Sequence, residues 1–145
     1  MSTEDDVRKA SKQFYAALNR MANGDAGTMA EIWSRDAAVT AMHPIGGCHV
    51  GWDAIKGSFD QFGQLASGGT IDLKEQRIRV ADDMACEVGT EHGQLKLAGQ
   101  QVTIEHRVTN VYQRTAGAWK MIHHHTDLSP ALLDVLKRVP PQPER

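Results

Sequence analysis

The chain has 145 residues and a mass of 15.9 kDa, a size that a single hydrophobic core commonly serves. Its 41% hydrophobic and 23% charged residues exclude a wholly disordered chain, and a formal net charge of -2 argues against partners such as nucleic acid or anionic lipid. The acidic start is unlike a signal peptide and no apolar run approaches the ~20 residues of a membrane span, so we expect a cytoplasmic protein without a membrane partner.

The first half of the chain predicts helices. Apolar residues recur at three- and four-residue steps in three stretches, residues 7–21, 28–33 and 52–62, which places them on one face of a helix in each case. Between the second and third stretches, residues 37–42 read as a short strand. Residues 43–47 read as a loop, because proline and paired glycines interrupt both kinds of regular structure.

The second half changes to a period of two, which predicts four long strands. Ile71 and Leu73 are out of phase with Ile78 and Val80, and we expect a bulge or bend between the two pairs. Turn signals separate the strands, and a helix begins at a serine and a proline; these signals lie at residues 82–83, 98–99, 116–117 and 129–130.

The alternation of residues in the middle two of these strands predicts which side chains face inward. In the earlier one, the side that carries Cys86, Val88 and Thr90 is the more apolar, and we expect it to face the interior and to continue to His92. In the next strand, apolar residues from Val102 to Tyr112 share a face on which His106 and Asn110 are interleaved. Because one slipped residue reverses a strand, these facings depend on the predicted phase.

Helices followed by a meander of strands indicate an α+β fold, with helices packed on one face of an antiparallel sheet. We expect a single domain over residues 1–139, followed by a proline-rich tail over residues 140–145. A strongly curved sheet of this kind wraps its helices and leaves a pocket at its open end, and such pockets are common ligand sites.

Short motifs along the chain resemble the nuclear transport factor 2-like superfamily, in its SnoaL-like and ketosteroid-isomerase-like branch, and also the association domain of calcium/calmodulin-dependent protein kinase II. The resemblance spans roughly residues 6 to 130 and implies a cone-shaped sheet around the leading helices. That superfamily hosts isomerases, cyclases, hydrolases and non-catalytic assembly domains. The motifs are Phe14-Tyr-Ala-Ala-Leu-Asn19, Trp33-Ser-x-Asp-Ala-x-Val39, His43-Pro-x-Gly46, Gly51-Trp-Asp-Ala-Ile55, Arg107-Val-Thr-x-Val-Tyr-x-Arg114, Gly117-x-Trp119 and His123-His-His125.

The resemblance implies a candidate catalytic set. In the steroid isomerases an aspartate directly before Pro-x-Gly is the general base, and His43 occupies that place here. Asn110 matches the late-strand acid, and Phe14 or Tyr15, about 100° apart on a helix, matches the helix tyrosine. A neutral imidazole suits proton abstraction and an amide can donate to an oxyanion. His43, Asn110 and Tyr15 are therefore the candidate catalytic residues of a cofactor-free isomerase, cyclase or hydrolase.

Further polar and aromatic residues are candidates for a ligand pocket. The resemblance places His124 and Thr126 on the concave face and His123 and His125 on the convex one. No Cys or His cluster has the spacing of a metal site, and no nucleotide or cofactor motif is present, so we expect neither a metal nor a cofactor. The expected ligand is small and either apolar or carboxylate-bearing. The candidate pocket residues are Trp33, Phe59, Phe62, Val88, His92, Tyr112, His124 and Thr126.

A half-apolar convex sheet face is typically covered by a partner, so we expect a homodimer through that face. It should present Arg107, Thr109, Val111, His123 and His125. A second function stays open, a non-catalytic oligomerisation or ligand-sensing domain similar to the kinase association domain. A cavity with His43 near Asn110 favours chemistry, whereas a hollow filled by side chains favours assembly.

Overall fold

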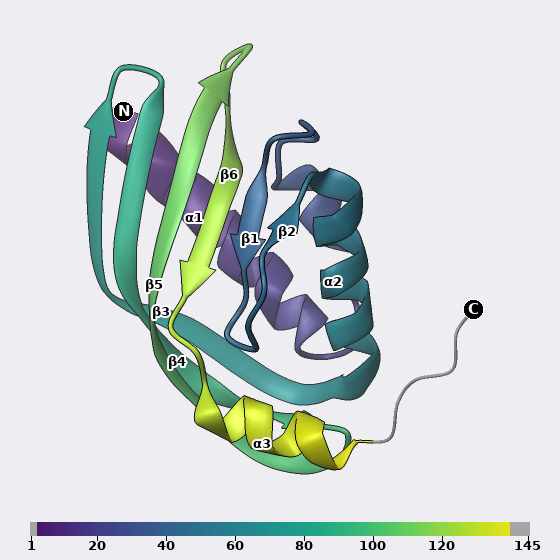
Figure 1. Ribbon diagram of the computed structural model, residues 1–145. Helices are drawn as coiled ribbons and strands as arrows, with labels where there is room; N and C mark the ends of the chain where they lie inside the picture. Colours follow the sequence, from purple (N-terminus) through teal and green to yellow (C-terminus); the bar gives the residue numbers. More distant parts are fainter. Residues whose placement is uncertain (1–2, 140–145) are drawn as a thin grey trace.

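The computed structural model describes residues 3–139 and shows helices cradled by a bent sheet (Figure 1). The proline-rich segment 140–145 lies outside the described residues. Within residues 3–139 no helix is long and apolar enough to cross a membrane. In chain order the elements are α1 (Thr3–Met21), the 3-10 helix η1 (Gly27–Glu31), β1 (Thr40–Met42), β2 (His49–Val50), α2 (Trp52–Leu65), β3 (Ala66–Ala81), β4 (Met84–Leu97), β5 (Gln100–Thr115), β6 (Ala118–Thr126) and α3 (Pro130–Arg138).

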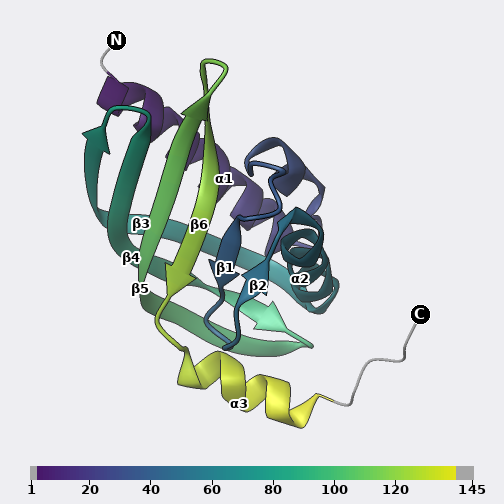
Figure 2. The same ribbon diagram turned by 45° about the horizontal axis from the view of Figure 1, so that its top comes forward.

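The strands form one six-stranded sheet in the order β2-β1-β6-β5-β4-β3. The long strands β3 to β6 pair antiparallel, and they bend around α1 as Figure 2 shows. This arrangement confirms the expected α+β fold with a curved sheet around the leading helices. The exception to the antiparallel pattern is β1, which pairs parallel with β6.

Helix α1 lies on the concave face because one of its sides is apolar. Val7, Phe14 and Leu18 are all buried at the predicted helical spacing. Its C-terminal half is fixed to β3 by Asn19, whose amide nitrogen donates to the carbonyl oxygen of Ile71 and whose oxygen accepts from the amide of Ile71, at 2.8 and 2.7 Å. This two-way bond sets how deeply α1 sits in the sheet.

Two register shifts bend β3, one between Ser67 and Thr70 and one between Lys74 and Arg77. The second confirms the bulge predicted from the change of phase. At the first bend β4 comes so close that a Cβ atom on Gly93 would lie 1.8 Å from the carbonyl oxygen of Thr70. Only glycine fits there, and the close approach allows β3 and β4 to curl around α1.

The facing predicted for β4 is wrong. Cys86, Val88 and His92 lie on the outer face, with Val88 38% exposed, whereas Glu87 and Glu91 point inward and are 0% and 3% exposed. The apolar character of Cys86 and Val88 suggested the opposite phase. The structure favours the phase that buries three apolar residues at the two ends of the strand, namely Ala85, Leu95 and Leu97. In β5 the predicted face is correct, since Val102, Ile104, His106, Val108, Asn110 and Tyr112 are all buried.

Candidate functional site

His43 follows β1 and lies against α2. Its Nε2 atom is 2.8 Å from the hydroxyl oxygen of Ser58, and that hydroxyl donates its own proton to the carbonyl oxygen of Ile55 at 2.6 Å. Since the serine has a single hydroxyl proton, His43 must donate from Nε2 to Ser58. The lone pair of the neutral imidazole is therefore on Nδ1.

The surroundings of His43 keep it neutral at physiological pH. Burial lowers the pKa of His43 to about 3, and charge on His124 or His49 would lower it further. The His43 ring centroid lies 6.0 Å from that of His124, 5.3 Å from that of His49 and 4.9 Å from that of Phe59. An imidazole among these neighbours is an unprotonated base.

The imidazole of His124 is the second one that a hydrogen bond fixes. Its Nδ1 atom lies 2.6 Å from Oδ1 of Asn110, an acceptor, so Nδ1 carries the proton and Nε2 carries the lone pair. Phe14 contacts the same ring at a centroid distance of 5.2 Å. Burial lowers the pKa of His124, although the charge of Glu91 works in the opposite direction. Two neutral imidazoles thus lie with their ring centroids 6.0 Å apart, one after β1 and one on β6.

Asn110 connects His124 to a buried hydrogen-bond network. Its amide nitrogen donates to the hydroxyl of Tyr15 at 3.1 Å and to Oε1 of Glu87 at 3.0 Å. The Tyr15 hydroxyl in turn donates to Oε2 of Glu91 at 2.9 Å. The structure therefore brings His124, Asn110 and Tyr15 together, and it is Tyr15 rather than Phe14 that brings a hydroxyl to Asn110.

Glu91 is the first of two buried carboxylates that the sequence interpretation missed. It accepts from Tyr15 and, at 2.8 Å, from Nε2 of His106. Burial opposes its charge, but the hydrogen bonds that it accepts from His106 and Tyr15 favour the charged form, and the pKa of Glu91 is lowered. Glu91 is therefore an ionised carboxylate held by donors from α1 and β5.

Glu87 is the second buried carboxylate. It precedes Glu91 by an even number of residues in β4, so the two side chains lie on the same face of the strand. It accepts from the amide nitrogen of Asn110, from the hydroxyl of Tyr112 at 2.9 Å and from Nε2 of Gln76 at 2.6 Å. Arg8 donates to Oε1 of Gln76 and so fixes which end of that amide faces the carboxylate. Burial first, and then the charge of Glu87, raise the pKa of Tyr112 well above its usual value, so this phenol stays protonated.

A sequence signal for these carboxylates exists in the spacing of β4. Glu87 and Glu91 share odd-numbered positions with Ala85, Leu95 and Leu97, all of which are buried. Counting backwards from the two leucines with a period of two would have placed both glutamates inside. The cost of burying them made the opposite phase look more favourable.

The other candidate pocket residues lie in three places. Phe59 is buried against His43, Trp33 is buried against Phe59 with their ring centroids 6.1 Å apart, and Phe62 is half-buried on α2. Tyr112, His124 and Thr126 are buried on the concave face of β5 and β6. The structure places Val88 and His92 on the outer face of β4, away from this group.

Some buried polar atoms of the described residues have no hydrogen-bond partner. They include Nε1 of Trp33, Oγ1 of Thr126 and Nδ1 of His106. Buried polar groups nearly always have hydrogen-bond partners, so a bound molecule or an ordered water is the expected partner of these atoms. Among residues 3–139 no group of three or more His, Cys, Asp or Glu side chains has a metal-binding arrangement.

The sequence model of the SnoaL-like domain family matches residues 7–131. The chain belongs to the SnoaL-like domain family. The match, together with many structural neighbours from the nuclear transport factor 2-like superfamily, confirms the resemblance read from the motifs. No curated protein matches this SnoaL-like chain in sequence.

Solved structures similar to this SnoaL-like chain carry different descriptions. A proposed dehydratase of the nuclear transport factor 2-like family from Streptomyces avermitilis is 25% identical, with 88% of this chain and 96% of that chain covered and a TM-score of 0.74. A proposed calcium/calmodulin-dependent protein kinase type II association domain from Thiobacillus denitrificans is also 25% identical, with 84% and 94% covered and a TM-score of 0.68. An uncharacterised protein with a cystatin-like fold from Caulobacter vibrioides shares 22% identity, 94% and 98% coverage and a TM-score of 0.72, which supports the fold alone.

Proposed function

We propose that this SnoaL-like protein binds a small carbonyl- or carboxylate-bearing molecule beside His43 and His124 and transfers a proton on it, with His43 as the base. The observation that carries the proposal is the fixed, unprotonated imidazole of His43 beside the second neutral imidazole of His124. A neutral imidazole takes up a proton most usefully when a negative charge develops nearby, because that charge raises its pKa. The two imidazoles suffice for the proton transfers, so the proposal requires no cofactor.

The proposed step begins at a carbon next to the carbonyl group of the substrate. Nδ1 of His43 takes the proton from this carbon, and the electron pair of the broken C–H bond moves toward the carbonyl oxygen to give an enolate. Return of the proton to a different carbon completes an isomerisation. Transfer of the proton to a leaving hydroxyl completes the loss of water. Ring-closing and hydrolytic reactions can likewise use a general base.

Asn110 and Tyr15 have a different role in this account from the one the resemblance implies. Both amide hydrogens of Asn110 and the hydroxyl hydrogen of Tyr15 are already donated to Tyr15, Glu87 and Glu91. They have no free donor for a developing enolate. We propose that Asn110 and Tyr15 are positioning residues that hold His124 with its Nε2 lone pair free.

Two further observations support the binding of a small molecule. The indole N–H of Trp33 and the hydroxyl of Thr126 are buried without partners, and a polar ligand can supply the missing acceptor. The similarity to a proposed dehydratase from Streptomyces avermitilis supports chemistry at a carbon next to a carbonyl, because eliminations of water commonly begin with removal of such a proton.

Deuterium exchange tests the proposal without knowledge of the natural substrate. The probe is 2-tetralone, a small apolar ketone with exchangeable protons next to its carbonyl, and loss of their ¹H NMR signal in D₂O is followed with time. We expect the wild-type protein to accelerate exchange and His43→Ala to abolish the acceleration. His125→Ala, which removes an exposed imidazole from β6, is the matched control and should exchange like wild type. Equal exchange with wild type and His43→Ala would contradict His43 as the base.

A second candidate function is that of a non-catalytic assembly or ligand-sensing domain. The observation that favours it is the completeness of the network, in which Glu87, Glu91, Asn110 and Tyr15 satisfy one another as in a structural core. Similarity to the proposed kinase association domain from Thiobacillus denitrificans supports it too. Absence of exchange with every small ketone tried, together with a stable oligomer, would favour this candidate.

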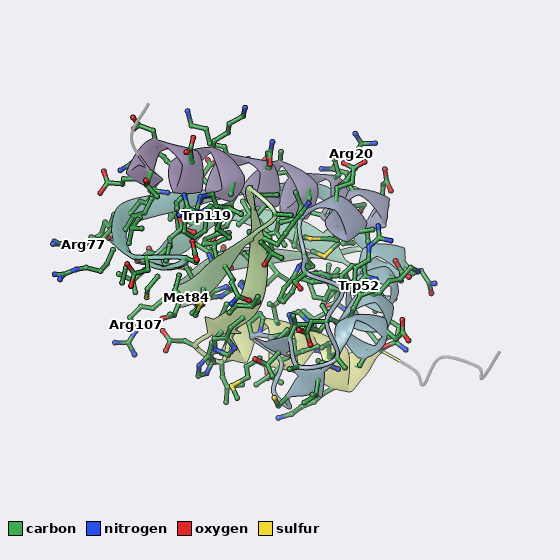
Figure 3. The ribbon with its side chains drawn as sticks, turned by 90° about the horizontal axis from the view of Figure 1, so that it is seen from above. Arg20, Trp52, Arg77, Met84, Arg107 and Trp119 are labelled. Carbon is green, nitrogen blue, oxygen red and sulfur yellow. The ribbon has the colours of Figure 1, made fainter. Side chains whose placement is uncertain are left out.

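For either function we propose that a second copy of the chain covers the outer face of β4 to β6. Met84 and Val88 are large apolar residues that are 40% and 38% exposed there, and Figure 3 shows Met84 and Arg107 on the side of the sheet away from α1. Sedimentation at micromolar concentration should report a dimer, and Val88→Lys should yield monomers. Val50→Lys, at an exposed valine on β2, is the control. A wild-type monomer would contradict the proposal.

A further inference from the structure

We infer that the cleft between the N-terminal half of α1 and the turn that joins β5 to β6 is a second binding site, for a small planar carboxylate. The cleft has a volume of about 710 Å³, within the range of pockets that hold small organic ligands. It is an open cleft lined by α1, by the turn between β3 and β4, and by the end of the β5–β6 hairpin. None of His43, Asn110 and His124 lines it, so the inference goes beyond the proposed function.

Trp119 supplies the first reason to expect a ligand there. Its ring lines the cleft, and its Nε1 atom is buried without any hydrogen-bond partner. In the view from above, Trp119 lies close to α1 (Figure 3). An indole N–H is a donor only, so its missing partner is an acceptor such as a carboxylate oxygen.

The two basic side chains near Trp119, those of Arg114 and Lys120, are held by hydrogen bonds. The guanidinium of Arg114 lies 5.3 Å from the centroid of the Trp119 ring, and both its Nε and its Nη2 donate to Oδ1 of Asp83, at 3.1 and 2.9 Å. Lys120, the next residue of β6, is tethered by donation from Nζ to the carbonyl oxygen of Glu31. A planar molecule entering the cleft therefore meets an ordered wall of aromatic and cationic groups.

The charges in the cleft favour an anion. Arg114 and Asp83 pair with each other, which leaves two lysines, Lys9 and Lys120, against the single carboxylate of Asp6. Lys9, on the α1 wall, makes no hydrogen bond or ion pair within residues 3–139, and neither does Gln13 one turn further on. A carboxylate that accepts from Trp119 and pairs with Lys9 satisfies both, while an aromatic body fills the space beside the indole.

Indole NMR with benzoate as the probe tests this site. The three tryptophans give three indole N–H resonances, and Trp119→Phe identifies the one from Trp119. We expect benzoate to shift the Trp119 resonance in a saturable way and to leave that of Trp52 in place. Benzamide, which has the same planar shape without the charge, should bind at least about fivefold more weakly.

Lysine variants make the result independent of how Trp119→Phe folds. Lys9→Gln should weaken benzoate binding about fivefold or more, because it removes the cation that pairs with the carboxylate. Lys12→Gln removes an exposed lysine of the same helix that does not line the cleft, and it should bind like wild type. An unmoved Trp119 resonance at millimolar benzoate, equal binding of benzamide, or equal losses in the two lysine variants would overturn the inference. Deuterium exchange at the His43 site is a separate measurement, so failure of one site does not imply failure of the other.

Discussion

Nδ1 of His124 lies 2.6 Å from Oδ1 of Asn110, and this contact sets the proton positions of the candidate site. The amide oxygen accepts, so the proton of the neutral imidazole must be on Nδ1. The amide nitrogen of Asn110 is in turn directed by the carboxylate of Glu87. A charge on β4 therefore determines, through one asparagine, which nitrogen of His124 keeps its lone pair.

The depressed pKa of His43 predicts that the protein loses stability in mild acid. In the unfolded chain the imidazole takes up a proton near pH 6.5, whereas in the folded protein it does so only near pH 3. Between these values the unfolded state binds more protons, so the free energy of unfolding falls as the pH falls, by up to about 1.4 kcal/mol per pH unit for this group. Partial exposure of the ring reduces this slope.

His43→Gln isolates that contribution. Glutamine retains an N–H donor for Ser58 but does not titrate, so urea unfolding of this variant should depend less steeply on pH between 6.5 and 3 than that of wild type. Above pH 7 the two proteins should show the same pH dependence, which serves as the internal control. Parallel curves through the acid range would show that His43 is already protonated or already exposed in the folded protein.

Glu87→Gln should destabilise the fold by about 1–3 kcal/mol, because it places a donor where three donors now converge. Gln76 has no easy way to turn its oxygen toward the new amide, since Arg8 holds that oxygen. The measurement is the midpoint of urea unfolding at pH 7. Glu105→Gln removes an exposed carboxylate from β5 and should leave the midpoint within about 0.5 kcal/mol of wild type. An unchanged unfolding midpoint for Glu87→Gln would mean that the hydrogen bonds to Glu87 do not outweigh the cost of burying its charge.

Gly93→Ala should prevent stable folding or cost more than about 3 kcal/mol, because the added methyl would lie 1.8 Å from the backbone oxygen of Thr70. Gly57→Ala offers the opposite case. Gly57 lies inside α2, and a methyl added there has nothing within 4 Å, so alanine should stabilise the protein by about 0.5–1 kcal/mol. Thermal unfolding of both variants checks the pair, and equal effects would contradict the close approach of β3 and β4.

The sequence predicted the fold well because local patterns dominate it. The apolar spacing of α1 placed Phe14 and Leu18 inside, and the change of phase after Leu73 located the bulge in β3. The serine and proline at residues 129–130 predict the start of the last helix, and the Ser129 hydroxyl accepts from the amide of Leu132 there as its N-cap. Each of these signals depends on residues within about one turn or one strand of each other.

The candidate site was predictable only in part, because its partners come from distant segments. Asn110 and Tyr15 were identified together through the resemblance, and they do meet in the structure. Glu87 and Glu91 were placed on the wrong face, since burying two carboxylates is favourable only when donors from α1, β3 and β5 converge on them. That convergence is a property of the tertiary structure. The period of two in β4, counted back from Leu95 and Leu97, indicates the facing of both glutamates but not the donors that make their burial favourable.

The most direct test of the whole account is the protonation state of the two facing imidazoles, read by long-range ¹H–¹⁵N NMR of the histidine side chains at pH 7. We predict a neutral His43 with its proton on Nε2 and a neutral His124 with its proton on Nδ1, the tautomers that Ser58 and Asn110 impose. An imidazolium at His43, or a proton on its Nδ1, would contradict the claim that this residue is a free base with its lone pair on Nδ1.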